Sequence, residues 1–347
     1  MHVVQSAAGG GPRCAALLAR DARRRGASVV VVVGGEERLA PDVDQVPLPS
    51  APLARTRALR SHLAATDILH VHGTRAATWA LPFLRTKRSV ATLHGLHPLR
   101  RPGPFPVRAA GWALVRTIVA AADAVVCVSE ADAHELARRR LGSPNVRVIQ
   151  NAVPRPQLRA DERATAREEL GVAEGCLLVL FLGRLEEAKG PLTALAIARR
   201  LESEDVTVAV AGGGELAHEL AQLAGPNVLL LGHRSDTERL LAAADVVLNT
   251  SRWEGLSLGL LEAMWAGRAI VASDVEGNAE AIGCAGILVP PDELDPFAEA
   301  VLSLRDDRKR ADLGRAAAAR VEERFSIERM MDEHAELYEA LLSRSGS

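Results

Sequence analysis

The chain has 347 residues, of which 48% are hydrophobic and 25% charged, and this composition excludes a disordered or fibrous protein. Its length exceeds what one hydrophobic core usually serves, so two domains are expected. The net charge of −2 hides an asymmetry. Residues 1–155 carry 22 Lys or Arg against 10 Asp or Glu, whereas the remainder carries 20 against 34.

The excess positive charge of the first half comes from clusters of arginine. Such clusters attract an anionic acceptor molecule or an anionic membrane surface, and they are also typical of an ordinary solvated surface. No nucleic acid partner is expected. The clusters lie at Arg23–Arg25, Arg55–Arg60, Arg85–Arg88, Arg100–Arg108 and Arg138–Arg140.

The apolar stretches of the chain indicate a cytoplasmic protein. The longest of them, Thr117–Val128, is interrupted by Asp123 and is too short to span a bilayer. The first residues enter a strand pattern without the basic and long apolar regions of a signal peptide. The cysteines are far apart and form no C-x-x-C pair, so they are expected to be small core residues in a reducing compartment: Cys14, Cys127, Cys176 and Cys284.

Strand-like apolar runs alternate with helix-like segments along the whole chain. This alternation predicts parallel sheets covered by helices, and therefore two doubly wound, Rossmann-like α/β domains. In the first half, strands are predicted at residues 3–6, 29–33, 68–72, 89–93, 125–129 and 146–149. In the second half, they are predicted at residues 177–182, 207–211, 228–231, 246–250, 269–273 and 287–289.

The two domains are predicted to meet near residue 155, because Pro154 and Pro156 interrupt the pattern there. The boundaries are then 1–155 for the first domain, 156–325 for the second and 326–347 for a terminal helix. Apolar residues recur at helical spacing in that last segment. Its apolar face needs a partner surface, which we expect on the first domain.

Two cations follow the strand predicted at residues 177–182. Arg184 comes directly after Gly183, and Lys189 lies shortly before Pro191, which suits the first position of a helix. Ligands of open α/β sheets bind at the carboxyl ends of strands, where a guanidinium and an ammonium can neutralise a diphosphate. Two cations in a loop are equally common on a solvated surface.

A run of glycines, Gly212, Gly213 and Gly214, ends the next predicted strand. Without side chains, their backbone can approach a ligand closely. A tight turn before a helix that begins near Glu215 would use the same residues. The run alone therefore does not distinguish a ligand-binding loop from a structural turn.

The most informative stretch follows the strand predicted at residues 246–250. It places Glu254 in a loop and Glu262 on a helix whose N-cap is Ser257, with free backbone donors at the helix start that can hold an anion. Eight residues of helix span about 12 Å. The carboxylates of glycosidases lie only about 5–9.5 Å apart. The two glutamates therefore suit the two ends of an elongated ligand. The alternative to ligand binding is a purely structural role, with a capping loop and a partly exposed glutamate on the helix.

In the first half, Gly9, Gly10 and Gly11 follow the first strand and precede a helix predicted at residues 13–25. They indicate a loop whose backbone approaches a ligand, although their spacing is neither the dinucleotide fingerprint nor a Walker loop. His94 ends the strand predicted at residues 89–93. Its imidazole can donate a hydrogen bond to a ligand there, and a buried structural histidine is the simpler alternative.

The histidines of the first half raise the question of a metal site. His70 and His72 share one strand face, and His94 and His97 follow the next strand. No carboxylate or cysteine completes a recognisable ligand set, so no metal is expected.

Together these motifs resemble those of glycosyltransferase family 4, whose members are retaining enzymes with the GT-B fold of two facing Rossmann-like domains. The resemblance covers nearly the whole chain, and it depends on the order and spacing of the motifs rather than on any one of them. The motifs are Gly9-Gly10, Arg24–Val29, Thr92–Gly95, Ala122–Ser129, Val148–Val153, Gly183–Leu185, Lys189-Gly190, Glu254 with Glu262, and Phe325-Ser326.

The resemblance implies that the first domain binds the acceptor and the second binds the nucleotide-sugar donor. Arg184 and Lys189 would bind the donor diphosphate, and Glu262 would bind the ribose hydroxyls. Glu254 would contact the transferred sugar, together with backbone amides at Gly255, Leu256 and Ser257.

Further donor contacts are implied in both domains. His94 would lie against the donor sugar near the reacting carbon, and the loop Gly9–Gly11 would close over the phosphates. Gly213 and Gly214 would line the donor site, and His233 would meet the edge of the nucleobase. The implied catalytic residues are His94, Glu254, Arg184 and Lys189.

The implied reaction is hexosyltransferase-like (class EC 2.4). A sugar passes with retention of its configuration from a UDP- or GDP-sugar to a hydroxyl acceptor, in the biosynthesis of a polysaccharide, a glycolipid or a small glycoconjugate. The resemblance implies no metal and no cofactor, the nucleotide-diphosphate sugar being a co-substrate. Two alternatives stay open for the basic first domain: it binds an anionic or lipid-linked acceptor in peripheral contact with the inner face of the membrane, or its arginines form an ordinary solvated surface.

Two stretches depart from the family pattern, and two other functions stay open. Gly267–Ala269 replaces the usual G-x-P, and Glu276–Glu280 replaces a Gly-Gly-x-Pro-Glu loop, so donor-sugar contacts there are expected to be atypical. A sugar-nucleotide epimerase shares the GT-B architecture, and a non-catalytic sugar-nucleotide-binding protein would share the site. The pair Asp42 and Asp44 resembles the D-x-D of metal-dependent glycosyltransferases but is interpreted as surface.

Overall fold

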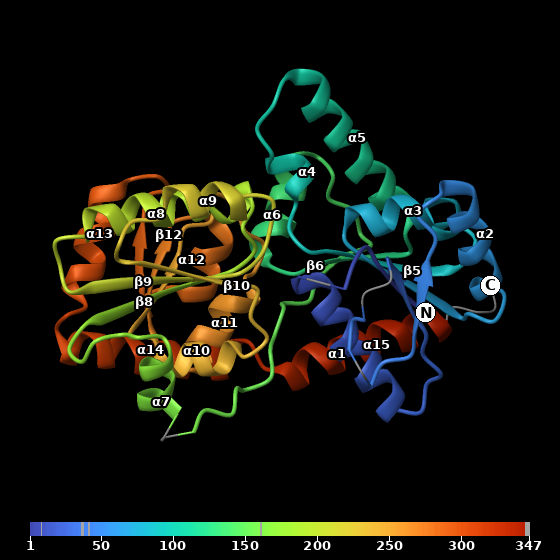
Figure 1. Cartoon of the computed structure of the whole chain (residues 1–347). Coiled ribbons are helices and arrows are strands. Elements are labelled where there is room, and N and C mark those ends of the chain that lie inside the picture. The colour runs from blue at the N-terminus through green and yellow to red at the C-terminus, as the bar shows by residue number, and fades with distance from the viewer. Residues whose placement is uncertain (8, 36–37, 41, 160–161, 344–347) are drawn as a thin grey trace. The chain divides into compact units, whose positions relative to one another are not determined.

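The computed structural model describes the chain except residues 8, 36–37, 41, 160–161 and 344–347. It divides into two compact units (Figure 1). Unit 1 comprises Met1–Asn151 and Ile327–Ser347, and unit 2 comprises Ala152–Ser326. The first division thus falls at Asn151, a few residues before the predicted boundary, and the terminal helix belongs to unit 1.

The described part of unit 1 contains a seven-stranded parallel sheet with strand order β3-β2-β1-β4-β5-β6-β7. The chain runs outward from β1 to β3 and then returns to place β4 on the other side of β1. Ligands of such sheets bind at the carboxyl ends of the strands, where the order reverses. The strands are β1 (His2–Val4), β2 (Val31–Gly34), β3 (Gln45–Leu48), β4 (Ile68–His72), β5 (Arg88–Leu93), β6 (Ala124–Cys127) and β7 (Val146–Val148).

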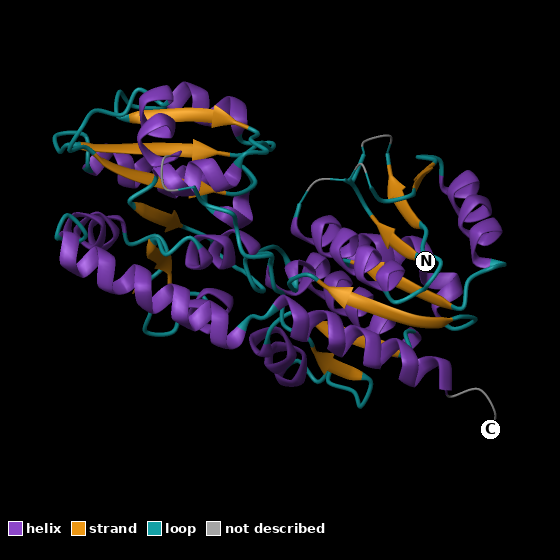
Figure 2. Ribbon diagram, turned by 90° about the horizontal axis from the view of Figure 1, so that it is seen from below, coloured by secondary structure: helices purple, strands orange, loops and turns teal. Residues whose placement is uncertain are grey.

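Helices connect these strands and cover the sheet (Figure 2). α15 contacts α1, and α1 in turn contacts β1 and β4, so the last helix completes the layer over the centre of the sheet. α3 packs on β4 and β5 and contacts α2 and α5. The helices of unit 1 are α1 (Gly10–Arg24), α2 (Pro52–Leu63), α3 (Thr74–Leu84), α4 (His97–Arg100), α5 (Phe105–Ala121), α6 (Glu130–Arg138) and α15 (Ile327–Ser343).

The described part of unit 2 contains a six-stranded parallel sheet with strand order β10-β9-β8-β11-β12-β13, which reverses between β8 and β11. Its central strands are buried on both faces, so they are continuous apolar runs such as Leu177–Leu182 rather than alternating ones. The strands are β8 (Leu177–Leu182), β9 (Val206–Ala211), β10 (Val228–Gly232), β11 (Val246–Asn249), β12 (Ala269–Ser273) and β13 (Ile287–Val289).

Two layers of helices cover this second sheet. Figure 1 shows α8, α9 and α13 on one side of it and α10, α11 and α14 on the other. The helices are α7 (Glu162–Glu169), α8 (Pro191–Arg200), α9 (Ala217–Leu223), α10 (Thr237–Ala243), α11 (Leu258–Trp265), α12 (Glu276–Ile282), α13 (Leu294–Ser303) and α14 (Asp307–Arg324).

The predicted strands are present, and the structure adds β3. This strand lies at the edge of its sheet and contains Pro47, which lacks an N–H and is tolerated there. Asp42 and Asp44 precede it and pair with Arg20 and Arg23, as expected for a surface pair.

Two further sequence expectations are wrong. α1 begins at Gly10 rather than at Arg13, so Gly10 and Gly11 are helical residues. Cys14 and Cys127 are buried as expected, but Cys284 is exposed. Among the described residues, no helix is both long and apolar enough to cross a membrane.

Candidate active site

The loop after β8 places Lys189 beside a carboxylate. Lys189 ends a single 3-10 turn, Glu187–Lys189, and its ammonium forms an ion pair with Oε2 of Glu254 in the loop after β11. The hydroxyl of Ser251 donates a hydrogen bond of 3.2 Å to the same oxygen. The Glu254 carboxylate is therefore held at the point where the strand order reverses.

Close backbone packing joins these two loops. Gly190 has a φ of 63°, and a Cβ atom on it would lie 2.2 Å from the carbonyl oxygen of Thr250. The Thr250 hydroxyl donates to the Gly190 carbonyl at 2.8 Å, and the Arg252 N–H donates to the Ala188 carbonyl at 2.9 Å. Only glycine fits at position 190, and the contact fixes Lys189 relative to the loop that carries Glu254.

Arg184 lies on the outer side of the same β8 loop. Its side chain is 53% exposed, and Nη2 lies 2.7 Å from Oε1 of Glu186. An anion entering this loop would compete with Glu186 for the guanidinium. The structure thus offers one mostly buried cation, Lys189, and one accessible cation, Arg184, after the same strand.

The glycine run after β9 serves the packing of the β8 loop. A Cβ atom on Gly212 would lie 1.8 Å from the Gly183 carbonyl oxygen, and one on Gly214 would lie 2.4 Å from the Leu185 carbonyl oxygen. A Cβ on Gly213 would instead lie 3.7 Å from Cβ of His233, an exposed residue. Gly213 and His233 are therefore neighbours, and the donor-binding role of Gly213, Gly214 and His233 stays a prediction.

The segment from Glu254 to Glu262 is buried. Glu254, Ser257 and Glu262 are each less than a tenth exposed, as is Leu256, and α11 begins just after Ser257. Ser257 thus occupies the predicted N-cap position, but its side chain makes no capping bond to the described backbone. A Cβ atom on Gly277 would lie 2.1 Å from the Gly255 carbonyl oxygen, so the start of α12 packs directly on this loop.

A buried polar network that the sequence did not reveal supports the Glu254 loop. Oδ1 of Asn249 accepts hydrogen bonds of 3.1 Å from the Ser251 N–H and from the side-chain amide of Asn278. The Ser273 hydroxyl donates to the Ser251 carbonyl. Asn278 belongs to Glu276–Glu280, the stretch that departs from the family pattern. That departure was the only sign in the sequence that this segment has a different role here.

In unit 1, the structure brings His94 to the first glycine loop. Gly9 has a φ of 109° and is the N-cap of α1. A Cβ atom on Gly11 would lie 2.9 Å from Cδ2 of His94, so the imidazole packs directly on the first turn of α1. The free backbone N–H groups at the start of a helix can bind an anion. This agrees with the expectation that the loop contacts the donor phosphates.

His94 is one of five clustered histidines. His72 Nδ1 lies 3.2 Å from His94 Nε2, and His72 Nε2 lies 3.0 Å from His2 Nδ1. His70 stacks on His72 with ring centroids 4.1 Å apart, and His334 of α15 stacks on His70 at 5.8 Å. The sequence did not reveal His2 and His334, because neighbouring strands and the docking of α15 bring them there.

Burial keeps these imidazoles neutral. Desolvation lowers the pKa of His94 and of His334 to about 4. It also lowers the pKa values of His2, His70 and His72 well below the usual range, with the neighbouring imidazoles contributing.

Nitrogen atoms of His2, His70 and His72 lie within 4.8 Å of one another, a spacing that a metal ion could use. Ring nitrogens of these residues already have partners, because His2 Nδ1 and His72 Nε2 bond each other. His70 bonds the Tyr338 hydroxyl at 2.7 Å and the Thr92 hydroxyl at 2.7 Å. A metal would have to replace these bonds, and the expectation of a metal-free protein stays a prediction.

Two doubly wound parallel sheets, in each of which the strand order reverses once, are the architecture of the GT-B fold. The comparisons agree: the solved structure of Anabaena HepE in complex with UDP-glucose superimposes with a TM-score of 0.86 at 21% identity, over 98% of both chains. Residues 8–155 match the family described as Glycosyltransferase Family 4, and residues 177–307 match Glycosyl transferases group 1. The chain belongs to glycosyltransferase family 4.

Curated relatives support this assignment. The chain is 32% identical over 290 residues to alpha-maltose-1-phosphate synthase of Mycolicibacterium smegmatis, covering 72% of each chain. It is 31% identical over 262 residues to D-inositol 3-phosphate glycosyltransferase of Kribbella flavida, covering 69% of this chain and 61% of the relative. The chain thus spans about three fifths of the length of that relative. Neither relative is named as an epimerase.

Proposed function

We propose that this protein is a retaining glycosyltransferase that moves a sugar from a nucleotide-diphosphate sugar to a hydroxyl acceptor. The observation that carries the proposal is the Lys189–Glu254 ion pair, which the packing of Gly190 on Thr250 holds between the ends of β8 and β11. A cation and a carboxylate placed side by side there suit a ligand that has both an anionic diphosphate and hydroxyl groups.

In the proposed complex, Lys189 and Arg184 bind the diphosphate and offset the charge that develops on it as the sugar leaves. Glu254 accepts hydrogen bonds from hydroxyls of the transferred sugar, and Glu262 accepts them from the ribose. The bond between the sugar carbon and the diphosphate breaks, the acceptor oxygen bonds to that carbon on the same face, and the acceptor proton passes to the leaving diphosphate. No metal takes part.

We propose a UDP-sugar as the donor, supported by the likeness of the fold to HepE, which was solved with UDP-glucose. The test is calorimetric titration with UDP, GDP, UDP-glucose and GDP-mannose. Binding of UDP and UDP-glucose, weakened at least tenfold by Arg184→Ala, supports the proposal. Glu187→Gln, a change to an exposed carboxylate next to the site, is the control and should bind as the wild type does. Preference for GDP compounds would overturn the choice of base.

We further propose that the first turns of α5 touch an anionic membrane in which the acceptor resides. Residues 101–110 are all exposed, and Phe105 and Val107 are 82% and 51% exposed. Arg101 and Arg108 flank them. Apolar side chains next to cations are the combination that binds anionic lipid surfaces.

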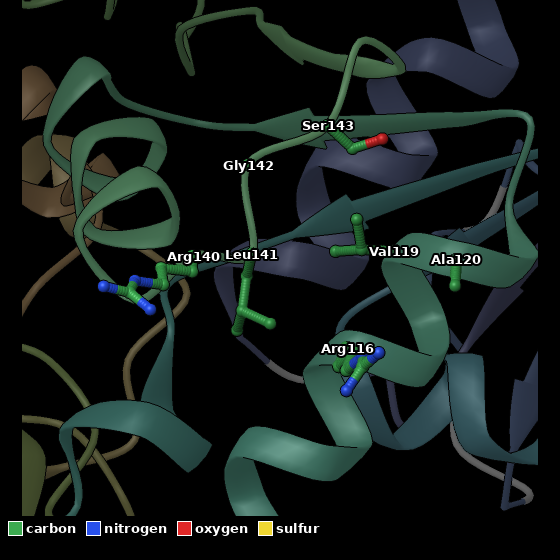
Figure 3. A pocket seen from close by; sticks show the side chains of 7 residues that line it. All are labelled: Arg116, Val119, Ala120, Arg140, Leu141, Gly142 and Ser143. Atoms are coloured by element: carbon green, nitrogen blue, oxygen red, sulfur yellow. The ribbon is translucent and has the colours of Figure 1, made fainter.

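A shallow pocket on unit 1 also carries basic groups. Figure 3 shows it between α5 and the turn after α6, with Arg116 and Arg140 among its lining residues. Two guanidinium groups and the hydroxyl of Ser143 are groups that bind anionic headgroups.

Co-sedimentation with vesicles tests the membrane contact. The wild type should bind vesicles containing phosphatidylglycerol and not those of phosphatidylcholine alone, and Phe105→Glu should abolish the binding. Leu223→Glu changes an exposed leucine of unit 2 and should not. Equal binding by Phe105→Glu and the wild type would refute a role of α5.

A further inference from the structure

The Nδ1 atom of His94 is a buried nitrogen that has no hydrogen-bond partner among the described residues. The other ring nitrogen, Nε2, bonds His72. Of the two ring nitrogens of His94, Nδ1 is therefore the one left to bond a ligand. Whether this atom donates or accepts depends on which nitrogen carries the proton, and a buried nitrogen without a partner is costly in either form.

The tautomer of His94 is coupled to two other histidines through a chain of hydrogen bonds. His94 Nε2 pairs with His72 Nδ1 at 3.2 Å, and His72 Nε2 pairs with His2 Nδ1 at 3.0 Å. The chain of hydrogen bonds crosses three neighbouring strands, because β1 pairs with β4 and β4 pairs with β5. All three imidazoles lie on one face of the sheet.

The number of protons in this chain is fixed. Each imidazole is neutral and carries one N–H, and each short N···N contact needs one donor and one acceptor. Two arrangements satisfy both conditions. In one, His2 donates to His72, His72 donates to His94, and the proton of His94 lies on Nδ1. In the other, every bond is reversed and Nδ1 of His94 is a bare acceptor.

We propose that His72, with His2 behind it, is a positioning residue that holds His94 with its proton on Nδ1, so that His94 presents a hydrogen-bond donor to the sugar nucleotide. This inference rests on the proposed function. The glucose unit of such a donor offers oxygen acceptors in its hydroxyls and its ring oxygen, whereas only its hydroxyls can donate. A fixed N–H at Nδ1 is therefore complementary to the ligand.

The simpler explanation is that the histidines only stabilise the core, and His70 is the residue that separates the two. His70 is as buried as His72 and stacks on it. Its nitrogens, however, bond Tyr338 and Thr92 and lie outside the chain that ends at His94. Substitution of His70 should therefore cost stability without changing the tautomer of His94.

The tautomer can be measured directly on the ligand-free protein. In protein labelled with ¹⁵N-histidine, long-range nitrogen–proton spectra at pH 7.5 should show a protonated Nδ1 and an unprotonated Nε2 for His94. His72→Leu and His2→Leu should release His94 into a mixture of tautomers, and His70→Leu should leave it unchanged. A proton on Nε2 in the wild type, or no response to both chain substitutions, would overturn the proposal.

A binding experiment separates this inference from the proposed function. His2→Leu, which is two bonds from His94, should weaken binding of UDP-glucose about 3- to 10-fold, the value of one neutral hydrogen bond. Binding of UDP, which lacks the sugar, should stay at the wild-type level. Equal weakening of both ligands would show a general structural effect and contradict the positioning role. If the wild type binds neither UDP-glucose nor UDP, the proposed donor is wrong. The nitrogen–proton spectra alone then test whether His72 and His2 set the tautomer of His94.

Discussion

The Lys189–Glu254 pair is a mostly buried charge pair whose two members come from different loops. Its cost in desolvation is offset because the ammonium, the carboxylate and the Ser251 hydroxyl satisfy one another. We propose that a donor sugar inserts its hydroxyls into this arrangement, and the charge of Glu254 then has a function beyond folding.

Replacing Glu254 by glutamine should lower the rate of sugar transfer at least 100-fold while the protein stays folded. The amide keeps the size of the side chain and an oxygen for Ser251 but loses the negative charge that accepts the strongest hydrogen bonds. Release of UDP in the presence of acceptor measures the effect, and circular dichroism verifies folding. Turnover at the wild-type level would refute the site assignment.

The five buried histidines predict an unusual dependence of stability on pH. In the unfolded chain their pKa is about 6.5, whereas burial lowers the pKa to about 4 for His94 and His334 and well below the usual range for the other three. Below pH 6.5 the unfolded chain therefore binds protons that the folded protein does not. As the pH decreases below 6.5, the free energy of unfolding should fall by about 1.4 kcal/mol per pH unit for each such histidine.

Urea denaturation at pH values from 7.5 to 4.5 measures this loss. The histidine contribution is complete above pH 6.5 and declines below it, and the part due to His94 and His334 is fully lost near pH 4. His334→Leu removes one titrating group and should flatten the slope by one proton between pH 6.5 and 4. Equal slopes in the two proteins would contradict the neutral state of His334.

At the scale of elements, the contact between the loops after β8 and β11 depends on one glycine. Gly190→Ala should destabilise unit 2 by about 2–4 kcal/mol, because the residue has a positive φ and its new Cβ would strike the Thr250 carbonyl. It should also weaken donor binding, since Lys189 is the adjacent residue. Chemical denaturation and calorimetry measure the two effects.

Gly171→Ala is the matched control. Gly171 also has a positive φ, 66°, but a Cβ atom there would meet nothing within 4 Å. It should cost only about 1–2 kcal/mol of backbone strain and leave donor binding unchanged. If Gly190→Ala is no worse than this control, the loop contact is not what fixes Lys189.

The long apolar strands were predictable because a strand buried on both faces is a continuous hydrophobic run, as in Leu177–Leu182. β3 was missed because Gln45–Leu48 has only four residues, begins with a polar one and is interrupted by Pro47. The loops with Arg184, Lys189 and Glu254 were predictable as strand ends. Their mutual contact was not, because sequence periodicity does not say which strands are neighbours. The same gap hid His2, which only the pairing of β1 with β4 brings to His72.

At the scale of the whole molecule, one assay tests the expectation that no metal takes part in the reaction. Sugar transfer should be unchanged after dialysis against EDTA, because in the proposed complex Lys189 and Arg184 supply the positive charge that a divalent cation gives in other enzymes. A loss of activity that Mg²⁺ or Mn²⁺ restores would contradict the metal-independent mechanism.

The position of α15 affects how the protein is made. Unit 2 is a single stretch of chain, whereas unit 1 needs Ile327–Ser343, which the ribosome adds after unit 2. His334 and Tyr338 of that helix contact His70, one of the five clustered histidines. Until α15 is synthesised, His70 lacks the contacts that His334 and Tyr338 provide. The order of synthesis therefore completes unit 1 after unit 2, although its first strand is synthesised before unit 2.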